Sequence, residues 1–351
     1  MINYFIIFLI SLFTAYIFTI FAKNIAFSIN AVDNPSEIKI HIKPTPRLGG
    51  LAIYMAFLIS IFWIYHFYRR LDFVFFKNKM IGVFFGGTIV FIVGLLDDVK
   101  TIKAFIKLII QGIASLILFF YGVRINLFPN LCLSFIFTFV YVVGSYSAMD
   151  MIDGLDGLAA GLTAICSIFF LVVFLQQGNE FGIFVSLILI GSSLGFLRHN
   201  FFPANIFMGD GGSMLLGFLL ATLMIIFTTQ PYNLIRFIIP ILILGVPILD
   251  NFLTFLYRFN ESKSFLAGDL NHFYNRIMNC GISQKNTVLI MYLISMIFGI
   301  NAILFTINVK IAWILLVIFV IILFFCVRKV RFLEEKLNLK NIIKDKYLRE
   351  E

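Results

Sequence analysis

Six aspartates, in three short segments that also contain glycine, are the residues of this chain best suited to chemistry. They are Asp97 and Asp98 in GLLDDVK, Asp150, Asp153 and Asp156 in MDMIDGLDGLAAG, and Asp210 in FMGDGGS. Carboxylates held close together repel one another, and a bound cation commonly allows a protein to tolerate them. Oxygen ligands suit Mg²⁺ or Mn²⁺, and protein-bound Mg²⁺ usually joins carboxylates to the phosphates of a substrate. The pattern therefore indicates a divalent-metal site that acts on phosphate groups.

A second feature is the start of the predicted helix that follows Asp210. Gly209, Gly211 and Gly212 surround this aspartate, and Ser213 stands where it could cap the helix. The unpaired N–H groups at a helix start favour a phosphate, and glycine lets the phosphate approach the backbone. We therefore expect Gly209 and Gly211 to contact a substrate phosphate, with a plain turn as the alternative for the glycines considered alone.

Basic residues accompany the acidic segments. The candidates for substrate binding are Lys43 and Arg47 in HIKPTPRLGG, Lys107 after the paired aspartates, and His272 and Arg276 in NHFYNR. Cations at such places can bind phosphate, although the bias of membrane proteins towards basic inner loops accounts for many of them individually. Lys43 and Arg47 stand out because prolines stiffen their loop.

Asp250 differs from the other aspartates because it lies inside an apolar segment, shortly after Pro247. A charge at that depth in a membrane is costly, and it normally faces the protein interior. We therefore expect a structural role, in which Asp250 braces Arg258 or another basic group.

The composition requires lipid as the solvent for much of the chain. Of the 351 residues, 61% are hydrophobic and 13% are charged, and the mean hydropathy is +1.01. A soluble domain carries about twice that charged fraction. The net charge of +9 comes from basic residues at segment ends and in a C-terminal tail, which indicates membrane orientation and anionic lipid rather than nucleic acid. The scattered cysteines indicate neither a zinc site nor a disulfide framework.

Eleven apolar segments are long enough to cross a bilayer, for which about 17 to 25 residues are typical. They lie near residues 2–22, 48–68, 80–96, 104–121, 132–149, 158–175, 181–197, 213–228, 236–257, 287–306 and 311–327. This pattern predicts an all-α fold, a polytopic transmembrane helical bundle with one span for each segment. We divide the chain into a single transmembrane catalytic domain, residues 1–327, and a basic cytoplasmic tail, residues 328–351.

The distribution of basic residues orients these spans, because cytoplasmic loops of membrane proteins are rich in Lys and Arg. With the N-terminus outside, most of the 27 Lys and Arg residues lie on the cytoplasmic side, and so does the C-terminal tail. One loop disagrees, since Arg69, Arg70, Lys77 and Lys79 then lie outside. Under this topology all six aspartates fall at the cytoplasmic face although they come from distant segments. That coincidence favours one site over scattered solubilising charges.

These segments together resemble the polyprenyl-phosphate N-acetylhexosamine-1-phosphate transferases of glycosyltransferase family 4. The resemblance runs from about Val32 to Arg276 and rests on HIKPTPRLGG, GLLDDVK, MIDGLDGLAAG, FMGDGGSMLLG and the stretch from PILDNF to NHFYNR, whose order and spacing make it specific. It implies a Mg²⁺-dependent enzyme, with Mn²⁺ as the alternative metal. In this reaction a polyprenyl (undecaprenyl) phosphate attacks the sugar-proximal phosphate of a UDP-N-acetylamino sugar and releases UMP.

The resemblance also implies roles for individual residues. Asp210 and the position of Asp150 hold the metal. Phe207 matches an aromatic residue suited to stacking on uracil, and Lys43 lies in a loop expected near the nucleotide. Chemistry or substrate placement is assigned to Asp97, Asp98, Asp153 and Asp156.

Departures from the family pattern narrow the branch. The family usually has Asn at the positions of Ser147 and Asp150; Asp150 still offers an oxygen ligand, whereas the role of Ser147 is open. Only His272 remains of a late histidine-rich cluster, which argues against the phospho-N-acetylmuramoyl-pentapeptide transferases. The chain is more similar to the undecaprenyl-phosphate GlcNAc-1-phosphate transferases. That branch implies the start of a cell-surface glycan (lipopolysaccharide, O-antigen or another cell-wall polymer), a bacterial inner (plasma) membrane and, as one assembly, a homodimer.

Several alternatives stay open on the sequence alone. The lipid phosphate is mostly dianionic at neutral pH, since its second pKa is about 6, so we expect it to attack the UDP-sugar directly; a covalent aspartyl intermediate is the rival mechanism. A transporter or flippase would carry its ionisable groups at mid-membrane, and a receptor would lack this chemistry. The CDP-alcohol phosphotransferases need a compact aspartate motif in one segment, whereas these aspartates are spread over several loops.

Overall fold

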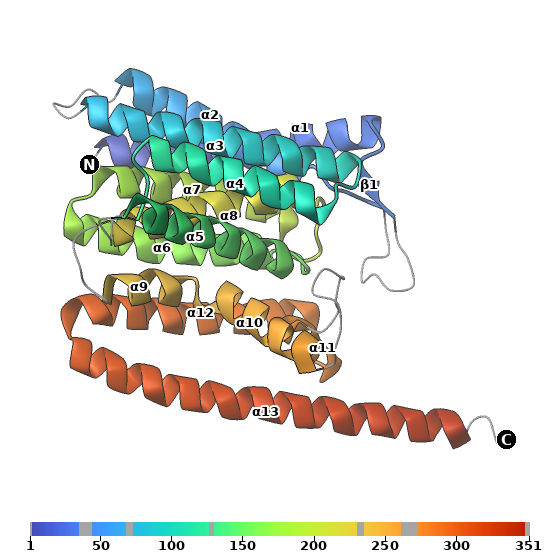
Figure 1. The fold of residues 1–351 in the computed structure, drawn as a ribbon. Helices are drawn as coiled ribbons and strands as arrows, with labels where there is room; N and C mark the ends of the chain where they lie inside the picture. The colour runs from blue at the N-terminus through green and yellow to red at the C-terminus, as the bar shows by residue number, and fades with distance from the viewer. Residues whose placement is uncertain are drawn as a thin grey trace.

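In the computed structural model the chain is a bundle of long helices (Figure 1). The structure describes residues 2–34, 44–67, 73–125, 130–229, 235–260 and 272–347. The helices are α1 (Ile2–Ser28), α2 (Gly49–Phe67), α3 (Phe73–Val99), α4 (Ala104–Phe120), α5 (Leu131–Ile152), α6 (Leu158–Gln177), α7 (Glu180–Asn200), α8 (Gly209–Thr228), α9 (Ile235–Ile243), α10 (Gly245–Asn260), α11 (Phe273–Asn279), α12 (Gln284–Ile307) and α13 (Val309–Tyr347). Two short strands, β1 (Val32–Asp33) and β2 (Thr45–Pro46), pair antiparallel with Val32 opposite Pro46. The predicted all-α fold is confirmed.

The described helices include nine that are long and apolar enough to cross a membrane. α9 and α10 are bent by 83° at their junction and make a tenth span if they count as one, while α4 is a shorter apolar helix. Each of the eleven predicted segments therefore falls on a helix or on this bent pair. Pro247 contributes to the break between α9 and α10, because it has no N–H to donate to the carbonyl of Ile243, the last residue of α9.

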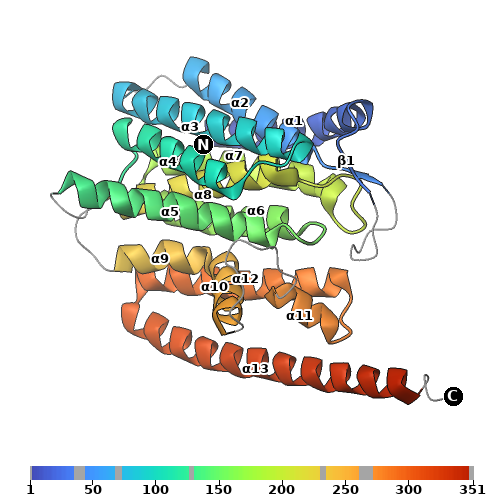
Figure 2. The same cartoon turned by 45° about the vertical axis from the view of Figure 1, so that its right-hand side comes forward.

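α8 runs through the interior of the bundle, whereas α13 lies at its edge (Figures 1 and 2). The apolar stretch of α8 is 100% buried, but only 11% of the corresponding stretch of α13 is buried. Lipid tails solvate such an exposed apolar face as well as another side chain would. α13 continues past residue 327, so the predicted boundary between the catalytic domain and the tail falls inside one helix. The division itself stays a prediction.

Glycines let α2 and α3 approach the start of α8 closely. A Cβ on Gly50 of α2 would lie 2.2 Å from the Gly212 nitrogen, and one on Gly94 of α3 would lie 2.6 Å from the Asp210 carbonyl oxygen. Small residues that permit close backbone contact are typical of helix packing in membranes. This contact brings the C-terminal end of α3, with its paired aspartates, against the N-terminal end of α8.

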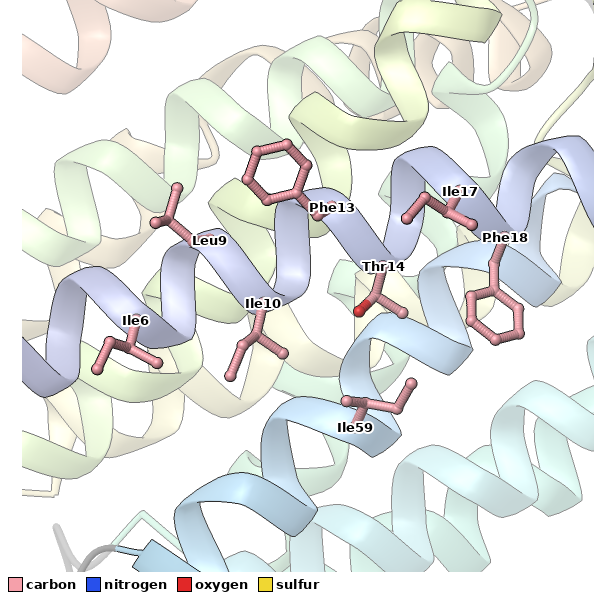
Figure 3. Close-up of a pocket in the computed structure, with 8 residues that line it drawn as sticks. All are labelled: Ile6, Leu9, Ile10, Phe13, Thr14, Ile17, Phe18 and Ile59. Atoms are coloured by element: carbon pink, nitrogen blue, oxygen red, sulfur yellow. The ribbon is translucent and has the colours of Figure 1, made fainter.

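An apolar groove of about 480 Å³ lies along α1, beside α2 (Figure 3). It is lined by Ile6, Leu9, Ile10, Phe13, Thr14, Ile17, Phe18 and Ile59. The lining side chains are hydrocarbon apart from the Thr14 hydroxyl, and Phe13 and Ile17 are about half exposed. The groove contains none of the candidate site residues, and its chemistry is that of a surface in contact with lipid tails.

Candidate active site

The acidic segments meet where the end of α3 and the starts of α4 and α8 come together. Lys107 of α4 lies between two aspartates, with its Nζ 2.5 Å from Asp97 Oδ2 and 2.5 Å from Asp210 Oδ2. Arg47 Nη2 lies 3.7 Å from Asp210 Oδ1. The side chains of Lys107, Asp97 and Asp210 are 16%, 12% and 21% exposed, so water screens these ion pairs only partly. The structure thus joins charges from three distant segments in one place.

Asp98 binds the start of α8 through both of its carboxylate oxygens. Oδ1 accepts a hydrogen bond from the Asp210 N–H (2.7 Å), and Oδ2 accepts one from the Gly211 N–H (3.0 Å). A carboxylate is favoured there because the first N–H groups of a helix lack partners and the helix dipole is positive at this end. Gly209 has φ +73°, and a Cβ on it would lie 2.2 Å from the Arg47 carbonyl oxygen. Asp98 therefore engages the amides of Asp210 and Gly211. Contact of Gly209 and Gly211 with the substrate stays a prediction.

Asp150 reaches the cluster from the end of α5. The Ser213 hydroxyl donates a hydrogen bond to Asp150 Oδ1 over 3.2 Å. We expected Ser213 to cap the helix after Asp210, but α8 already begins at Gly209, so Ser213 lies one turn inside and joins α8 to α5. Asp150 and Asp210, the two predicted metal ligands, are therefore linked through the first turn of α8.

Asp153 lies in the turn after α5. No described residue donates a hydrogen bond to its carboxylate. Burial raises the pKa of Asp153 well above its ordinary value, and the negative charges of Asp210, Asp150 and Asp98 raise it further. Ionisation of this carboxylate becomes favourable when a cation approaches. The electrostatics of the cluster thus favour an added positive charge near Asp153.

Asp156 braces the segment that leads to α8. Its Oδ2 accepts a hydrogen bond from the Ala204 N–H (2.9 Å). Asn200 supports the same segment, because its side chain accepts a hydrogen bond from the Gly157 N–H (3.0 Å) and donates one to the Ile206 carbonyl (2.9 Å). Asn200 is not among the predicted site residues, because its position at the end of an apolar helix gives no signal of this role. Both side chains hold backbone in this structure.

Phe207 connects the start of α8 to the loop that carries Arg47. The Phe207 N–H donates a hydrogen bond to the Pro46 carbonyl (2.8 Å), and its carbonyl accepts one from the Gly49 N–H (2.9 Å). The backbone of Phe207 is thereby fixed beside the loop that carries Arg47, and stacking of its ring on uracil stays a prediction. Lys43, the other predicted nucleotide-binding residue of this loop, lies outside the described residues.

His272 and Arg276 lie on the segment that forms α11, next to α10. His272 Nδ1 lies 2.8 Å from Asp250 Oδ2, and the Phe273 N–H donates to Asp250 Oδ1 over 2.7 Å. The basic partner expected for Asp250 is therefore this histidine. The Arg276 guanidinium lies 4.7 Å from the centre of the Tyr257 ring, a cation–π contact. The predicted roles of His272 and Arg276 in substrate binding stay predictions.

The chemistry of the cluster fits a hard divalent cation. Among the described residues, no group of three or more His, Cys, Asp or Glu is placed to hold a metal ion alone. Mg²⁺, however, is usually bound by one or two carboxylates, and water and substrate phosphates complete its shell. Asp150 and Asp210 offer such oxygens, and Asp153 adds a carboxylate to which no residue in the described part of the chain donates a hydrogen bond. The donor set suits a metal that binds together with its phosphate substrate.

Similarity to known proteins covers most of the chain. Residues 80–228 match the family model described as glycosyl transferase family 4. The chain is 35% identical to the probable undecaprenyl-phosphate N-acetylglucosaminyl 1-phosphate transferase of Bacillus subtilis (strain 168), over 92% of this chain and 90% of that protein. It is 32% identical to the decaprenyl-phosphate N-acetylglucosaminephosphotransferase of Mycobacterium leprae (strain TN), over 80% of this chain and 79% of that protein.

The chain is also similar, at a lower identity than to these two proteins, to a transferase of the peptidoglycan branch. A phospho-N-acetylmuramoyl-pentapeptide-transferase of Clostridium botulinum (strain Eklund 17B / Type B) is 29% identical over 74% of this chain and 82% of that protein. The predicted resemblance, including its closer relation to the N-acetylglucosamine 1-phosphate transferases, is confirmed. The five motifs, the helical bundle and these relatives agree, and the chain belongs to glycosyl transferase family 4.

Proposed function

We propose that the chain transfers an N-acetylamino-sugar 1-phosphate from a UDP-sugar to a polyprenyl phosphate and releases UMP. The names of its relatives favour N-acetylglucosamine as the sugar, and undecaprenyl or decaprenyl phosphate as the acceptor. The observation that carries the proposal is the position of Lys107 between Asp97 and Asp210, beside Arg47. Cations and carboxylates from distant segments meet there, as the binding of a diphosphate with a metal requires.

The reaction exchanges one phosphoanhydride for another, so the site mainly has to bring two anions together. An oxygen of the lipid phosphate attacks the sugar-proximal phosphorus of the UDP-sugar. A new P–O bond forms as the bond to the UMP phosphate breaks, and UMP leaves with that electron pair. Lys107 and Arg47 are placed to neutralise the phosphates. A general base contributes little, because the lipid phosphate, with a second pKa of about 6, is already mostly dianionic.

Asp150 and Asp210 are the residues that would hold Mg²⁺. The ion would supply Lewis-acid stabilisation of the negative charge on the diphosphate of the UDP-sugar. Ser213 orients Asp150 by a hydrogen bond, and Lys107 orients Asp210 by an ion pair. Asp98 fixes the first turn of α8, so it positions the metal ligand Asp210 through the backbone.

An assay of the purified protein tests this function. UMP release is measured with undecaprenyl phosphate and a panel of UDP-N-acetyl sugars, and it should require both the lipid and Mg²⁺. Asp210→Asn should reduce the rate by about a hundredfold or more, because it removes a carboxylate that would hold the metal. Lys107 keeps its ion pair with Asp97 in this variant, so the protein should still fold in detergent.

Glu180→Gln, in the first turn of α7, is the matched control for that substitution. Unchanged UMP release in Asp210→Asn contradicts the site assignment. Exchange of UMP into UDP-sugar without any lipid contradicts direct attack and supports an aspartyl intermediate.

The membrane location can be stated more finely as a proposal. The spans make the chain a multi-pass membrane protein. We place it in the plasma (inner) membrane with the carboxylate cluster on the cytoplasmic side, where its product starts a surface glycan such as lipopolysaccharide, O-antigen or a cell-wall polymer. A cysteine at exposed Lys100, in a variant without Cys132 and Cys326, should react with an impermeant maleimide in inverted vesicles only. Labelling in intact cells would show that Lys100 lies on the outer face and that the proposed orientation is wrong.

A further inference from the structure

Outside the carboxylate cluster, a buried aspartate–histidine pair joins α10 to α11. Asp250 is 1% exposed, and its Oδ2 lies 2.8 Å from His272 Nδ1. Its Oδ1 accepts a hydrogen bond from the N–H of Phe273, the first residue of α11 (2.7 Å). The Thr254 hydroxyl lies 3.3 Å from the same histidine nitrogen. Both oxygens of one carboxylate therefore fix the start of α11 to α10.

This histidine in turn supports Tyr274. The two rings stack with their centroids 5.2 Å apart and their planes 3° apart. Tyr274 is 4% exposed, and its hydroxyl donates a hydrogen bond to the Met151 carbonyl over 3.3 Å. A Cβ on Gly154 would lie 2.1 Å from the same hydroxyl oxygen, so the ring rests directly on the turn after α5. Burial raises the pKa of Tyr274, and the charges of Asp250 and Asp153 add to this, so the hydroxyl stays a donor.

Asp153 lies in the turn that Tyr274 contacts, between Met151 and Gly154. No described residue forms a hydrogen bond with its carboxylate. The position of this carboxylate therefore depends on the backbone of the turn. Tyr274 holds this backbone on both sides of Asp153.

We propose that Tyr274, supported by the Asp250–His272 pair, is a positioning residue that holds the turn of residues 151–154 and, with it, the Asp153 carboxylate. The inference rests on the proposed transferase function. It gives His272 a positioning role in place of the substrate contact predicted from the sequence. A misplacement of about 1 Å can cost about a hundredfold in rate, so a single restraint on this turn affects catalysis even though Tyr274 touches no substrate.

Tyr274→Phe removes the hydroxyl and leaves the stacked ring in place. We expect the kcat of UMP release to fall about threefold to tenfold, the equivalent of one neutral hydrogen bond, with an unchanged KM for the UDP-sugar. Amide hydrogen exchange in a peptide covering residues 150–156 should become faster. Tyr54→Phe is the matched control, because it removes a tyrosine hydroxyl that donates to Thr88 Oγ1 (3.1 Å) between α2 and α3.

His272→Gln, alone and combined with Tyr274→Phe, tests the support given by the histidine. If the two residues act in one chain of contacts, the double variant loses little more kcat than the more impaired single variant. A raised KM with unchanged kcat in His272→Gln assigns this residue to substrate contact and overturns the inference. Unchanged kcat and unchanged exchange in Tyr274→Phe overturn it as well. Wild-type protein that releases no UMP contradicts the proposed function instead, while the exchange measurement still tests the restraint on the turn.

Discussion

Buried carboxylates are held in two different ways in this molecule. In the Asp250–His272 pair, each carboxylate oxygen has a partner fixed at a helix junction, the His272 ring or the Phe273 N–H. In the cluster around Asp210, the partners are the long side chains of Lys107 and Arg47. A lysine on its flexible stem can move aside for a substrate or a metal, whereas a stacked histidine at a helix junction cannot. The difference separates carboxylates that hold the fold from carboxylates that are available for chemistry.

The paired aspartates of GLLDDVK show the same division between neighbours in the sequence. Asp97 forms an ion pair with Lys107, and the N–H of Ile102 donates a hydrogen bond to its other oxygen. Asp98 binds two backbone amides at the start of α8. Asp97 therefore has a charged partner that can move, whereas Asp98 holds two helices together. The motif identifies the region of the active site, and the contacts of each aspartate indicate which of the two is available for chemistry.

Replacement of Lys107 with Met should have the largest effect of these changes. It leaves Asp97 and Asp210, which are half-buried, close together without the cation between them, and the two carboxylates then repel one another. We expect a lower Tm in detergent and a loss of activity of about tenfold or more. Mg²⁺ should raise the Tm of this variant more than that of the wild type, because the ion takes the place of the ammonium group.

Thermal unfolding with and without Mg²⁺ measures this effect. Lys103→Met, at an exposed position just before α4, is the control and should behave as the wild type. Equal Mg²⁺ shifts in Lys107→Met and the wild type would show that the charges around Asp210 are as fixed as those of Asp250.

Gly94→Ala tests whether the carboxylate cluster depends on the close packing of α3 against α8. The added Cβ would lie 2.6 Å from the Asp210 carbonyl oxygen, in backbone that cannot yield easily. Overpacking of this kind costs about 1–3 kcal/mol, and it separates Asp98 from the amides of α8. The Tm and the rate of UMP release should therefore fall together. Gly144→Ala on α5, with open space around its Cβ position, should leave both unchanged.

The spans were predictable because lipid solvent imposes a simple rule on the sequence, namely long apolar runs. The segment 236–257 was predicted as one span, whereas the structure bends by 83° between Ile243 and Gly245. Composition does not report such a bend. Pro247 was visible, but its consequence depends on how the two short helices pack against α12 and α5.

The site was predictable at the level of residue types and not at the level of contacts. Six aspartates in three segments indicated one phosphate and metal site, and the structure brings Asp97, Asp98, Asp150 and Asp210 into one network with Lys107, Arg47 and Ser213. The bond of Asp98 to the start of α8 spans 112 residues of sequence. The pairing of Asp250 with His272 was equally hidden, because both depend on how helices pack rather than on any local pattern.

Asp250→Asn is the mildest of these changes and the sharpest test of the distinction. Asparagine keeps an oxygen for the Phe273 N–H and offers its amide group to His272, so the geometry survives while the charge is lost. We expect the free energy of unfolding to fall by about 1–2 kcal/mol and kcat to fall severalfold through Tyr274, with an unchanged KM for the UDP-sugar. Thermal unfolding and steady-state kinetics measure these effects. A raised KM at unchanged stability would place Asp250 among the carboxylates that contact the substrate. The distinction between carboxylates that hold the fold and carboxylates available for chemistry would then be wrong.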